Sequence, residues 1–254
     1  MRTVFARFAL AAICFITPQM SVPQVALANM EVAPLVMDLE GGVGEQGSFG
    51  VTNTTDTDIP VSIRIVRRQI SADGTTEMLP ADGEFILFPP QAAIGPLKSQ
   101  LFRFRYVGEP LEGQSRSYYI YATQLPVDLE NQGNDVEGVQ ARIDFLYEFG
   151  ISLNLIPEEA APELIVTRAE RSRMPDGAVS AQLTIENRGN RFARIADYEL
   201  TITAGGQSAT FTPAMLRQGL ANGFWLPGQS FTIDFPVEGM PAGSLEATLS
   251  PTGS

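Results

Sequence analysis

The sequence predicts an all-β protein made of two sandwich domains in tandem. Turn-forming pairs and clusters of Gly, Pro, Asn and Asp recur at short intervals, and short runs of alternating apolar and polar residues lie between them. Many short strands with one modest helical candidate are typical of sandwiches rather than of a parallel sheet covered by helices. A proline-flanked acidic break after the longest alternating run divides the chain into two parts.

The N-terminal residues have the pattern of a secretory signal. Arginines at positions 2 and 7 precede the apolar run 8–16, and an A-x-A cleavage site follows at residues 26–28. The apolar run is shorter than the roughly 20 residues needed to cross a bilayer, and we expect no membrane span. We therefore expect residues 1–28 to be removed on export, so that the mature chain begins near Asn29.

Composition excludes several classes of function. The one cysteine, Cys14, lies in the signal, so the exported protein is expected to form no disulfide. Histidine is absent, which removes a required member of Ser-His-Asp triads and of the common zinc sites. Lys98 is the only lysine of an acidic chain whose formal charge is −12, so a nucleic-acid partner is not expected. We expect no catalytic residues, no cofactor and no metal.

Three short runs alternate clearly enough to predict strands, and one segment predicts a helix. Residues 213–220 are the helical candidate, with Thr212 as the N-cap and Pro213 at the first helical position. The strand runs lie within residues 61–70, 101–106 and 181–187, where the apolar positions are Val61, Ile63 and Ile65, then Phe102, Phe104 and Tyr106, then Ala181, Leu183 and Ile185.

The longest alternating run, "VQARIDFLYEFGISLNLIP" at residues 139–157, has an apolar side chain at every odd position from Val139 to Leu155. If extended, it would reach about 60 Å, three times the ~20 Å of a typical strand. Either the chain bends and serves two sheets of its own fold, or part of the apolar row is reserved for another protein. Alternation alone leaves both readings open.

The segment "IPEEAAPE", directly after this run, is the expected domain boundary. Two prolines there bracket two acids and two alanines. We expect a first domain at residues 29–157, a linker at 158–161 and a second domain at 162–254. Each domain then has about the size of an immunoglobulin-like sandwich, ~100 residues.

Two local patterns match known binding sequences but lack their context. "GVGEQG" at residues 42–47 has the G-x-G-x-x-G spacing of a dinucleotide-binding loop, yet a β-type run follows it instead of a helix, which favours a glycine-rich turn. Asn53 opens the glycosylation sequence "NTT", and we interpret it as a turn residue.

Acidic and aromatic side chains could form an enzyme or a sugar-binding site, but their placement favours structure. The acids Asp38, Glu40, Glu158 and Glu159 are spread through turns of an acidic surface and do not suggest a catalytic pair. The tyrosines of "SYYIYATQLP", at positions 118, 119 and 121, could join Trp225 in a sugar platform. They are better explained by a core strand with aromatic residues on both faces.

The order of several segments resembles the periplasmic chaperones of the chaperone/usher pilus pathway. Residues 84–106 resemble the proline-containing segment of that family and its following strand, including the arginine expected at Arg103. Residues 115–127 resemble the strand that closes in an aliphatic-Pro pair, here Leu125-Pro126. Residues 139–157 resemble the last strand of the first domain, while "LTIENRGNRFARI" and "FWLPGQSFTID" resemble a hairpin and a late strand of the second.

The resemblance implies a function for the long run. Such chaperones act in the periplasm and are not enzymes. They lend alternating apolar residues to pilus subunits that lack a strand, a form of β-strand addition, and deliver the subunits to an outer-membrane usher. The part near Phe149 to Leu155 would then complete a sheet of the chaperone itself. The residues facing the client would be Ile143, Phe145, Tyr147 and Phe149.

This chain departs from the family at its charged positions. The arginine and lysine that usually hold the terminal carboxylate of the client fall on Val36 and Ser152, and a charged interdomain pair falls on Ala93 and Ser115. We therefore expect client binding to depend less on that carboxylate, unless one of four other arginines replaces the anchor: Arg103, Arg105, Arg116 or Arg142. The alternative function is a secreted β-sandwich binding or adhesion module whose long strand is only its own core.

Overall fold

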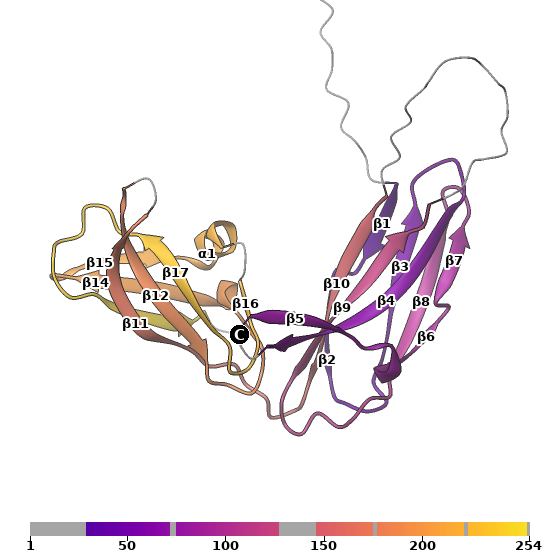
Figure 1. Cartoon of the computed structure of the whole chain (residues 1–254), viewed down its shortest axis with the longest axis horizontal. Helices are drawn as coiled ribbons and strands as arrows, with labels where there is room; N and C mark the ends of the chain where they lie inside the picture. Colours follow the sequence, from indigo (N-terminus) through magenta and orange to yellow (C-terminus); the bar gives the residue numbers. More distant parts are fainter. Residues whose placement is uncertain (1–28, 72–74, 127–145, 175–176, 221–222, 253–254) are drawn as a thin grey trace, which may run out of the picture.

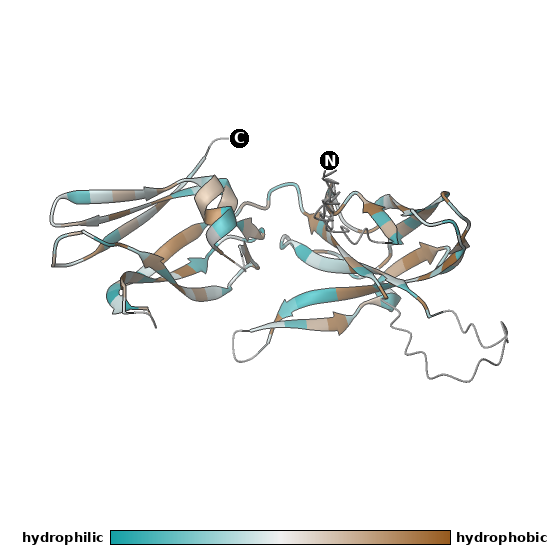
Figure 2. Ribbon diagram, turned by 90° about the horizontal axis from the view of Figure 1, so that it is seen from above, coloured by the Kyte–Doolittle hydropathy of each residue, from teal (hydrophilic) through white to brown (hydrophobic). Residues whose placement is uncertain are grey.

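The computed structural model describes residues 29–71, 75–126, 146–174, 177–220 and 223–252, and nearly all of its regular structure is β-strand, as predicted. The strands form two lobes set at an angle, and β5 extends from the first lobe toward the second (Figure 1). Viewed from above, strands of both lobes carry alternating hydrophobic and hydrophilic segments (Figure 2). Among the described residues, no helix is long and apolar enough to cross a membrane.

Two sheets make up the first lobe. The smaller has the order β1-β3-β8-β6, and the larger the order β2-β10-β9-β4-β5, with β7 paired to the other end of β4. Strands of the smaller sheet are β1 (Met30–Ala33), β3 (Gln46–Asn53), β8 (Ser99–Tyr106) and β6 (Phe85–Phe88), and those of the larger are β2 (Val36–Glu40), β10 (Glu148–Ile156), β9 (Arg116–Gln124), β4 (Ile59–Ile70), β5 (Thr76–Pro80) and β7 (Gln91–Ile94); a short 3₁₀ turn, η1, spans Asp82–Glu84.

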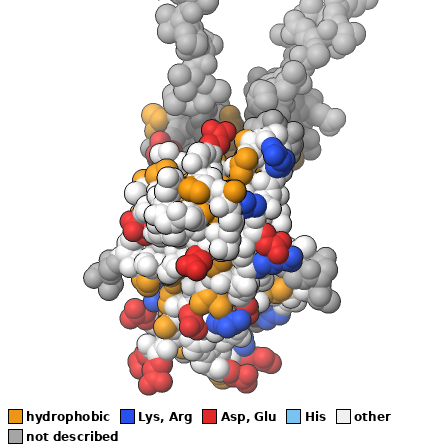
Figure 3. Space-filling model, turned by 90° about the vertical axis from the view of Figure 1, so that its left-hand side faces the viewer, with side chains coloured by type: hydrophobic (Ala, Val, Ile, Leu, Met, Phe, Trp, Pro, Cys, Tyr) orange, Lys and Arg blue, Asp and Glu red, His pale blue; other side chains and the backbone are white. Residues whose placement is uncertain are grey.

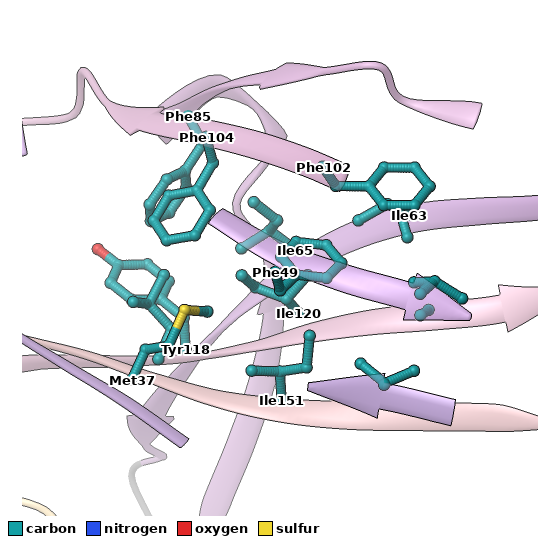
Figure 4. Close-up of a cluster of buried hydrophobic side chains, with 14 of the residues drawn as sticks. Met37, Phe49, Ile63, Ile65, Phe85, Phe102, Phe104, Tyr118, Ile120 and Ile151 are labelled. Atoms are coloured by element: carbon teal, nitrogen blue, oxygen red, sulfur yellow. The ribbon is translucent and has the colours of Figure 1, made fainter. Parts of the chain in front are cut away.

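Side chains from the inner faces of both sheets meet in one core (Figure 4). Phe49 and Phe102 stack from neighbouring strands of the smaller sheet, with ring centroids 5.4 Å apart. Ile120 and Ile151 meet them from the larger sheet, and all four are buried. The alternation predicted within residues 61–70 and 101–106 lies in β4 and β8, because Val61, Ile63 and Ile65 of β4 and Phe102, Phe104 and Tyr106 of β8 enter this core.

The second lobe has its own core, which contains no buried residue of the first. Its sheets have the orders β11-β12-β17 and β15-β14-β18, with the short pair β13-β16 beside them. Their bounds are β11 (Leu164–Arg173), β12 (Val179–Asn187), β17 (Ser230–Pro236), β15 (Gln207–Phe211), β14 (Tyr198–Ala204), β18 (Glu246–Pro251), β13 (Ala193–Arg194) and β16 (Phe224–Trp225), with η2 at Ile195–Asp197. The alternation at residues 181–187 lies in β12.

The predicted helix is confirmed as α1 (Pro213–Gly219), in which the Thr212 side chain accepts a hydrogen bond from the Met215 amide. The expected linker, residues 158–161, lies between the end of β10 at Ile156 and the start of β11 at Leu164. We propose the same division into domains. Two of the turn-forming pairs, at residues 73–74 and 175–176, lie outside the described residues.

Two fully buried asparagines tie down turns in corresponding ways. The Asn53 side-chain amide donates to the carbonyls of Thr57, Ile94 and Gly95 at 2.6, 2.9 and 3.0 Å, and its oxygen accepts from Thr55. In the second lobe, the Asn187 amide donates to the carbonyls of Arg191 and Trp225. The Asn53 nitrogen is thus fully engaged in the fold, consistent with a structural role for this residue.

The remaining local patterns also take structural roles. Residues 42–47 form the turn into β3, where Gly44 has a φ of 99° that favours glycine. Trp225 is buried in the second lobe and donates from Nε1 to the Ile185 carbonyl at 3.1 Å, so it joins no platform with the tyrosines of β9. Of these tyrosines, Tyr118 enters the first core, while Tyr119 and Tyr121 lie on the opposite face.

Candidate functional site

Strand β10 has neighbours on both sides along only part of its length. It pairs antiparallel with β9 from Glu148 to Leu155. On its other side, β2 pairs with it in parallel, and only from Ser152 to Ile156. Within the described part of the chain, no strand pairs with this side of residues 148–151, which we call the open edge. Its backbone groups could pair with an added strand.

Burial changes along the apolar row of β10 at the same point. Ile151, Leu153 and Leu155 are fully buried in the first core, whereas Phe149 and the preceding Tyr147 are half-buried and pack against its rim. This agrees with the expectation that the C-terminal part of the run closes the home sheet. Ile143 and Phe145 lie outside the described residues, and the assignment of the four client-facing residues stays a prediction.

Val36 and Ser152, where the resembled family carries its cations, are direct register partners on β2 and β10. Val36 is 54% exposed, and the Ser152 amide donates to the Leu35 carbonyl at 2.9 Å. The two aligned positions therefore do meet at the end of the open edge, but neither carries a charge.

The arginines proposed as substitutes lie elsewhere. Arg103 and Arg105 are on the exposed face of β8, in the other sheet. Arg116 donates to the Tyr106 hydroxyl and to the carbonyls of Glu109 and Pro110. Arg142 lies outside the described residues. None of the three described arginines is a register neighbour of the Val36–Ser152 pair.

Two other arginines lie on the sheet face that contains this pair, and the sequence analysis missed them. The Arg64 guanidinium lies 4.2 Å from the ring centroid of Tyr121, and that of Arg68 lies 4.7 Å from the ring of Tyr119. Tyr119 is the register partner of Ser152. The spacing of four between the arginines and of two between the tyrosines could have indicated a shared face, but only strand pairing brings them together.

Side chains of the second lobe reach the same face. Arg68 also stacks on Phe224 at 3.8 Å, and Phe224 in turn stacks on Phe192 with 4.9 Å between ring centroids. Arg194 forms an ion pair with Asp38 of β2, with N–O distances of 2.8 and 2.9 Å. The Gln229 side chain donates to the Thr76 hydroxyl of β5 at 2.8 Å. This face is therefore the inner surface between the two lobes.

Of the two positions expected at the contact between the domains, Ser115 lies there and Ala93 does not. Ser115 does lie at the contact, where its hydroxyl accepts from the Phe192 amide at 2.9 Å. Ala93 does not, because β7 pairs with the start of β4 while the second lobe contacts the end of β4. The charged contact is formed instead by Asp38 and Arg194. Burial raises the pKa of Asp38, but hydrogen bonds from Arg194 and Asn154 outweigh it and hold that pKa below its usual value.

Among the residues that the structure describes, no group of three or more His, Cys, Asp or Glu is placed to hold a metal ion. On the face seen from the end of the second lobe, acidic and basic side chains are interspersed (Figure 3).

Comparisons with known proteins identify the fold. No protein-family model and no curated protein matches the chain. A chain from a structure of the chaperone–tip adhesin complex of CFA/I fimbriae is 16% identical and matches 89% of this chain and 100% of its own length, with a TM-score of 0.52. The class 5 fimbriae chaperone CfaA is 14% identical and matches 87% and 98%, with a TM-score of 0.52.

A third structure, the CsuC–CsuE chaperone–tip adhesion subunit complex of archaic Csu pili from Acinetobacter baumannii, contributes a chain that is 16% identical. The match covers 88% of this chain and 97% of that one, with a TM-score of 0.52. At such identities the likeness establishes the fold alone. The chain has the two-domain immunoglobulin-like fold of pilus chaperones, and the predicted fold class is confirmed.

Proposed function

We propose that this chain, which has the fold of the pilus chaperones, is itself a periplasmic chaperone that binds, folds and caps pilus subunits. In this proposal β10 and the residues before it are lent to a subunit that lacks one strand, and the capped subunit passes to an outer-membrane usher. The protein acts by binding and catalyses no reaction. Export to the periplasm rests on the signal pattern of residues 1–28.

The observation that carries this proposal is the open edge. Within the part of the chain that the structure describes, residues 148–151 have no strand partner on one side, and they continue directly from an alternating apolar sequence that begins at Val139. A subunit strand added at this edge would extend the sheet, and the odd side chains would supply the apolar row that the subunit lacks. Tyr147 and Phe149 are half-buried at the edge of the core of the first lobe. They lie where the apolar residues that pack in this protein would give way to those that pack in the subunit.

Replacing Phe145 with aspartate tests the proposal. If Phe145 enters a subunit groove, the carboxylate must be desolvated there, whereas it can stay in water in the free chaperone. Co-purification of subunit should fall by orders of magnitude, while the melting temperature of the free protein stays within a few degrees. The test uses small exported β-proteins, where such proteins are encoded beside the gene for this chain.

Even positions of the same run provide matched controls. Asp144→Ala and Glu148→Ala should change neither quantity much, since Glu148 makes only exposed contacts with Arg64 and Thr123. A Phe145→Asp protein that unfolds would support the alternative of a binding module whose long strand is its own core. One that keeps both fold and subunit would leave the strand-lending proposal without support.

An exposed apolar surface favours a second partner, as delivery to an usher requires. On the outer face of the smaller sheet, Ile86 and Phe88 of the edge strand β6 are 60% and 72% exposed, opposite Arg105 and Arg103, and Leu101 on the same face of β8 is 46% exposed. Apolar side chains gathered on an edge strand typically mark an interaction site. Phe88→Ser should leave subunit binding intact and reduce assembly of the surface fibre; unchanged assembly would assign the usher contact elsewhere.

A further inference from the structure

The open edge contains a glycine that the backbone does not require. Gly150 is exposed and lies between Glu148 and Ser152 on the sheet face opposite the first core. Its φ lies outside the positive range that favours glycine. Within a strand, glycine costs conformational entropy and leaves a gap in the row of side chains, and it often marks a place where another chain approaches closely. The reason for glycine at this position must therefore lie in its surroundings.

The Tyr121 ring lies across the position where a side chain at Gly150 would stand. Tyr121 is the register partner of Gly150 on β9. A Cβ atom at position 150 would lie 3.3 Å from Cε1 of Tyr121 and 3.7 Å from Cδ1 of Tyr119. Because Cε1 belongs to the far half of the ring, the ring reaches over Gly150 toward the open edge. Tyr121 is half-buried, with the Arg64 guanidinium 4.2 Å from its ring centroid. Its ring edge is therefore within reach of a side chain placed beside Gly150.

Exposed apolar side chains lie at the end of the open edge. Leu35 precedes β2 and Val36 begins it, and they are 50% and 54% exposed. Val36 pairs with Ser152, so it lies on the same sheet face as Gly150, two positions further along β10. At the other end, the carboxylate of Glu148 pairs with Arg64 at 3.3 Å, which makes that end polar. Large apolar side chains exposed beside a strand edge favour a partner that covers them.

We propose that the open edge selects subunit strands with a bulky apolar side chain, aromatic or branched, at the position beside Gly150. Opposite side chains on adjacent strands lie about 5 Å apart, so this side chain would pack over Gly150, against the Tyr121 ring edge and Val36. An aromatic side chain that covers a neighbouring glycine stabilises a strand pair. Gly150 and Tyr121 then determine which subunits bind. This inference rests on the proposed function, because it takes the added strand to belong to a subunit.

Disulfide trapping identifies the subunit residue beside Gly150. The one cysteine of the chain, Cys14, lies in the expected signal, so Gly150→Cys supplies the only thiol of the exported protein. The probe is the exported β-protein that co-purifies with the wild-type chain, with single cysteines placed in turn along its strands. The cysteine that cross-links should stand where the natural subunit has Leu, Ile, Met, Phe, Tyr or Trp. A small or polar natural residue at that position would overturn the inference.

Affinity for the same subunit tests the two selecting residues. Tyr121→Ala should weaken binding at least tenfold, whereas Tyr121→Phe, which keeps the ring, should not. Gly150→Val, whose side chain must displace the Tyr121 ring, should also weaken binding at least tenfold. Shortening the cross-linked subunit residue to alanine should remove most of this second effect, because the two changes act on one contact. Ser117→Ala is the matched control: it lies on the same face of β9 but opposite Asn154, beyond the open edge, and should leave the affinity unchanged.

Melting curves of the free variants separate selection from packing. Each should melt within a few degrees of the wild type, because Gly150 and Tyr121 lie outside the core. If Gly150→Val melts much lower but binds the subunit as tightly as the wild type, Gly150 serves only the packing of Tyr121 and the inference is wrong. Unchanged affinity in Tyr121→Ala would overturn the inference and leave strand lending intact. If no exported protein co-purifies, or if one binds but no position cross-links to Gly150→Cys, the strand-lending proposal fails, and this inference fails with it.

Discussion

Replacing Ile151 with alanine should destabilise the free protein strongly, because Ile151 is the first fully buried residue of the β10 row. It lies in the core between the two sheets of the first domain, near Ile120 and Met37 (Figure 4). Truncation of a fully buried Ile, Leu or Met to Ala costs about 2–5 kcal/mol through lost burial and the cavity left behind. For a domain of this size, roughly 3 kcal/mol corresponds to a fall in melting temperature on the order of 10 °C.

Phe149→Ala, two residues earlier on the same face, is the matched comparison. Phe149 is only half-buried in the free protein, so much of its apolar surface is already in water and the cost should be about 1 kcal/mol. Under the proposed function, truncation of Phe149 should instead weaken subunit binding. Ile151→Ala would then lower the stability of the free protein more than Phe149→Ala does, and Phe149→Ala would lower the affinity for the subunit more.

The assay can follow each domain separately. Trp225 is the single tryptophan and lies in the core of the second domain, so its fluorescence reports unfolding of that domain alone. Calorimetry or far-ultraviolet circular dichroism reports both domains. Ile151→Ala should move the first-domain transition and leave the tryptophan transition nearly in place. If Phe149→Ala destabilises the free protein as much as Ile151→Ala does, the row belongs to the home core throughout, and the reasoning from the open edge fails.

Three further predictions follow from other parts of the chain. Mass spectrometry of the exported protein should find an N-terminus near Asn29, and a chain that retains Cys14 would contradict the signal assignment. The folded-state pKa of Asp38 is held below its usual value of 3.8, so its ion pair with Arg194 should contribute fully above about pH 4 and be lost as the pH falls through the lowered pKa. Melting curves between pH 5 and pH 3 should therefore show a steeper loss of stability in the wild type than in Asp38→Asn. Asn53→Ala should lower the free energy of unfolding by roughly 3 kcal/mol, since it leaves three buried or part-buried carbonyls without their donor. A loss below about 1 kcal/mol, measured by urea unfolding, would show that water replaces the amide.

Local sequence patterns predicted the strands and the helix well where residues within a few positions of one another determine the structure. Residues 61–65 and 101–106 alternate because one face of each strand enters the core, and Thr212-Pro213 starts the helix because the N-cap and the fixed φ of proline act within one turn. Asn53 was expected in a turn, but its backbone is the last residue of β3; its side chain holds the turn that follows through hydrogen bonds with Thr55 and Thr57.

The division of the long alternating run could not be predicted from the run itself. A side chain at Phe149 and one at Ile151 obey the same alternation whether the facing surface is the home core or another protein. What separates them is the point where β2 begins to pair with β10, and that pairing joins residues more than a hundred positions apart. The same limit applies to Arg68, because its stacking on Phe224 depends on the placement of the second domain.

The parallel pairing of β2 with β10 gives the open edge a fixed end. In the proposed complex, a subunit strand that adds beside β10 can advance toward the second domain only as far as Ile151, because the next backbone position is taken by Val36. To go further it would have to displace β2, which five register pairs and the hydrogen bond from Asn154 to Asp38 hold in place. β2 would thus act as a molecular stop. Subunits of different length would then be aligned at the same end, and any difference in length would extend away from the second domain.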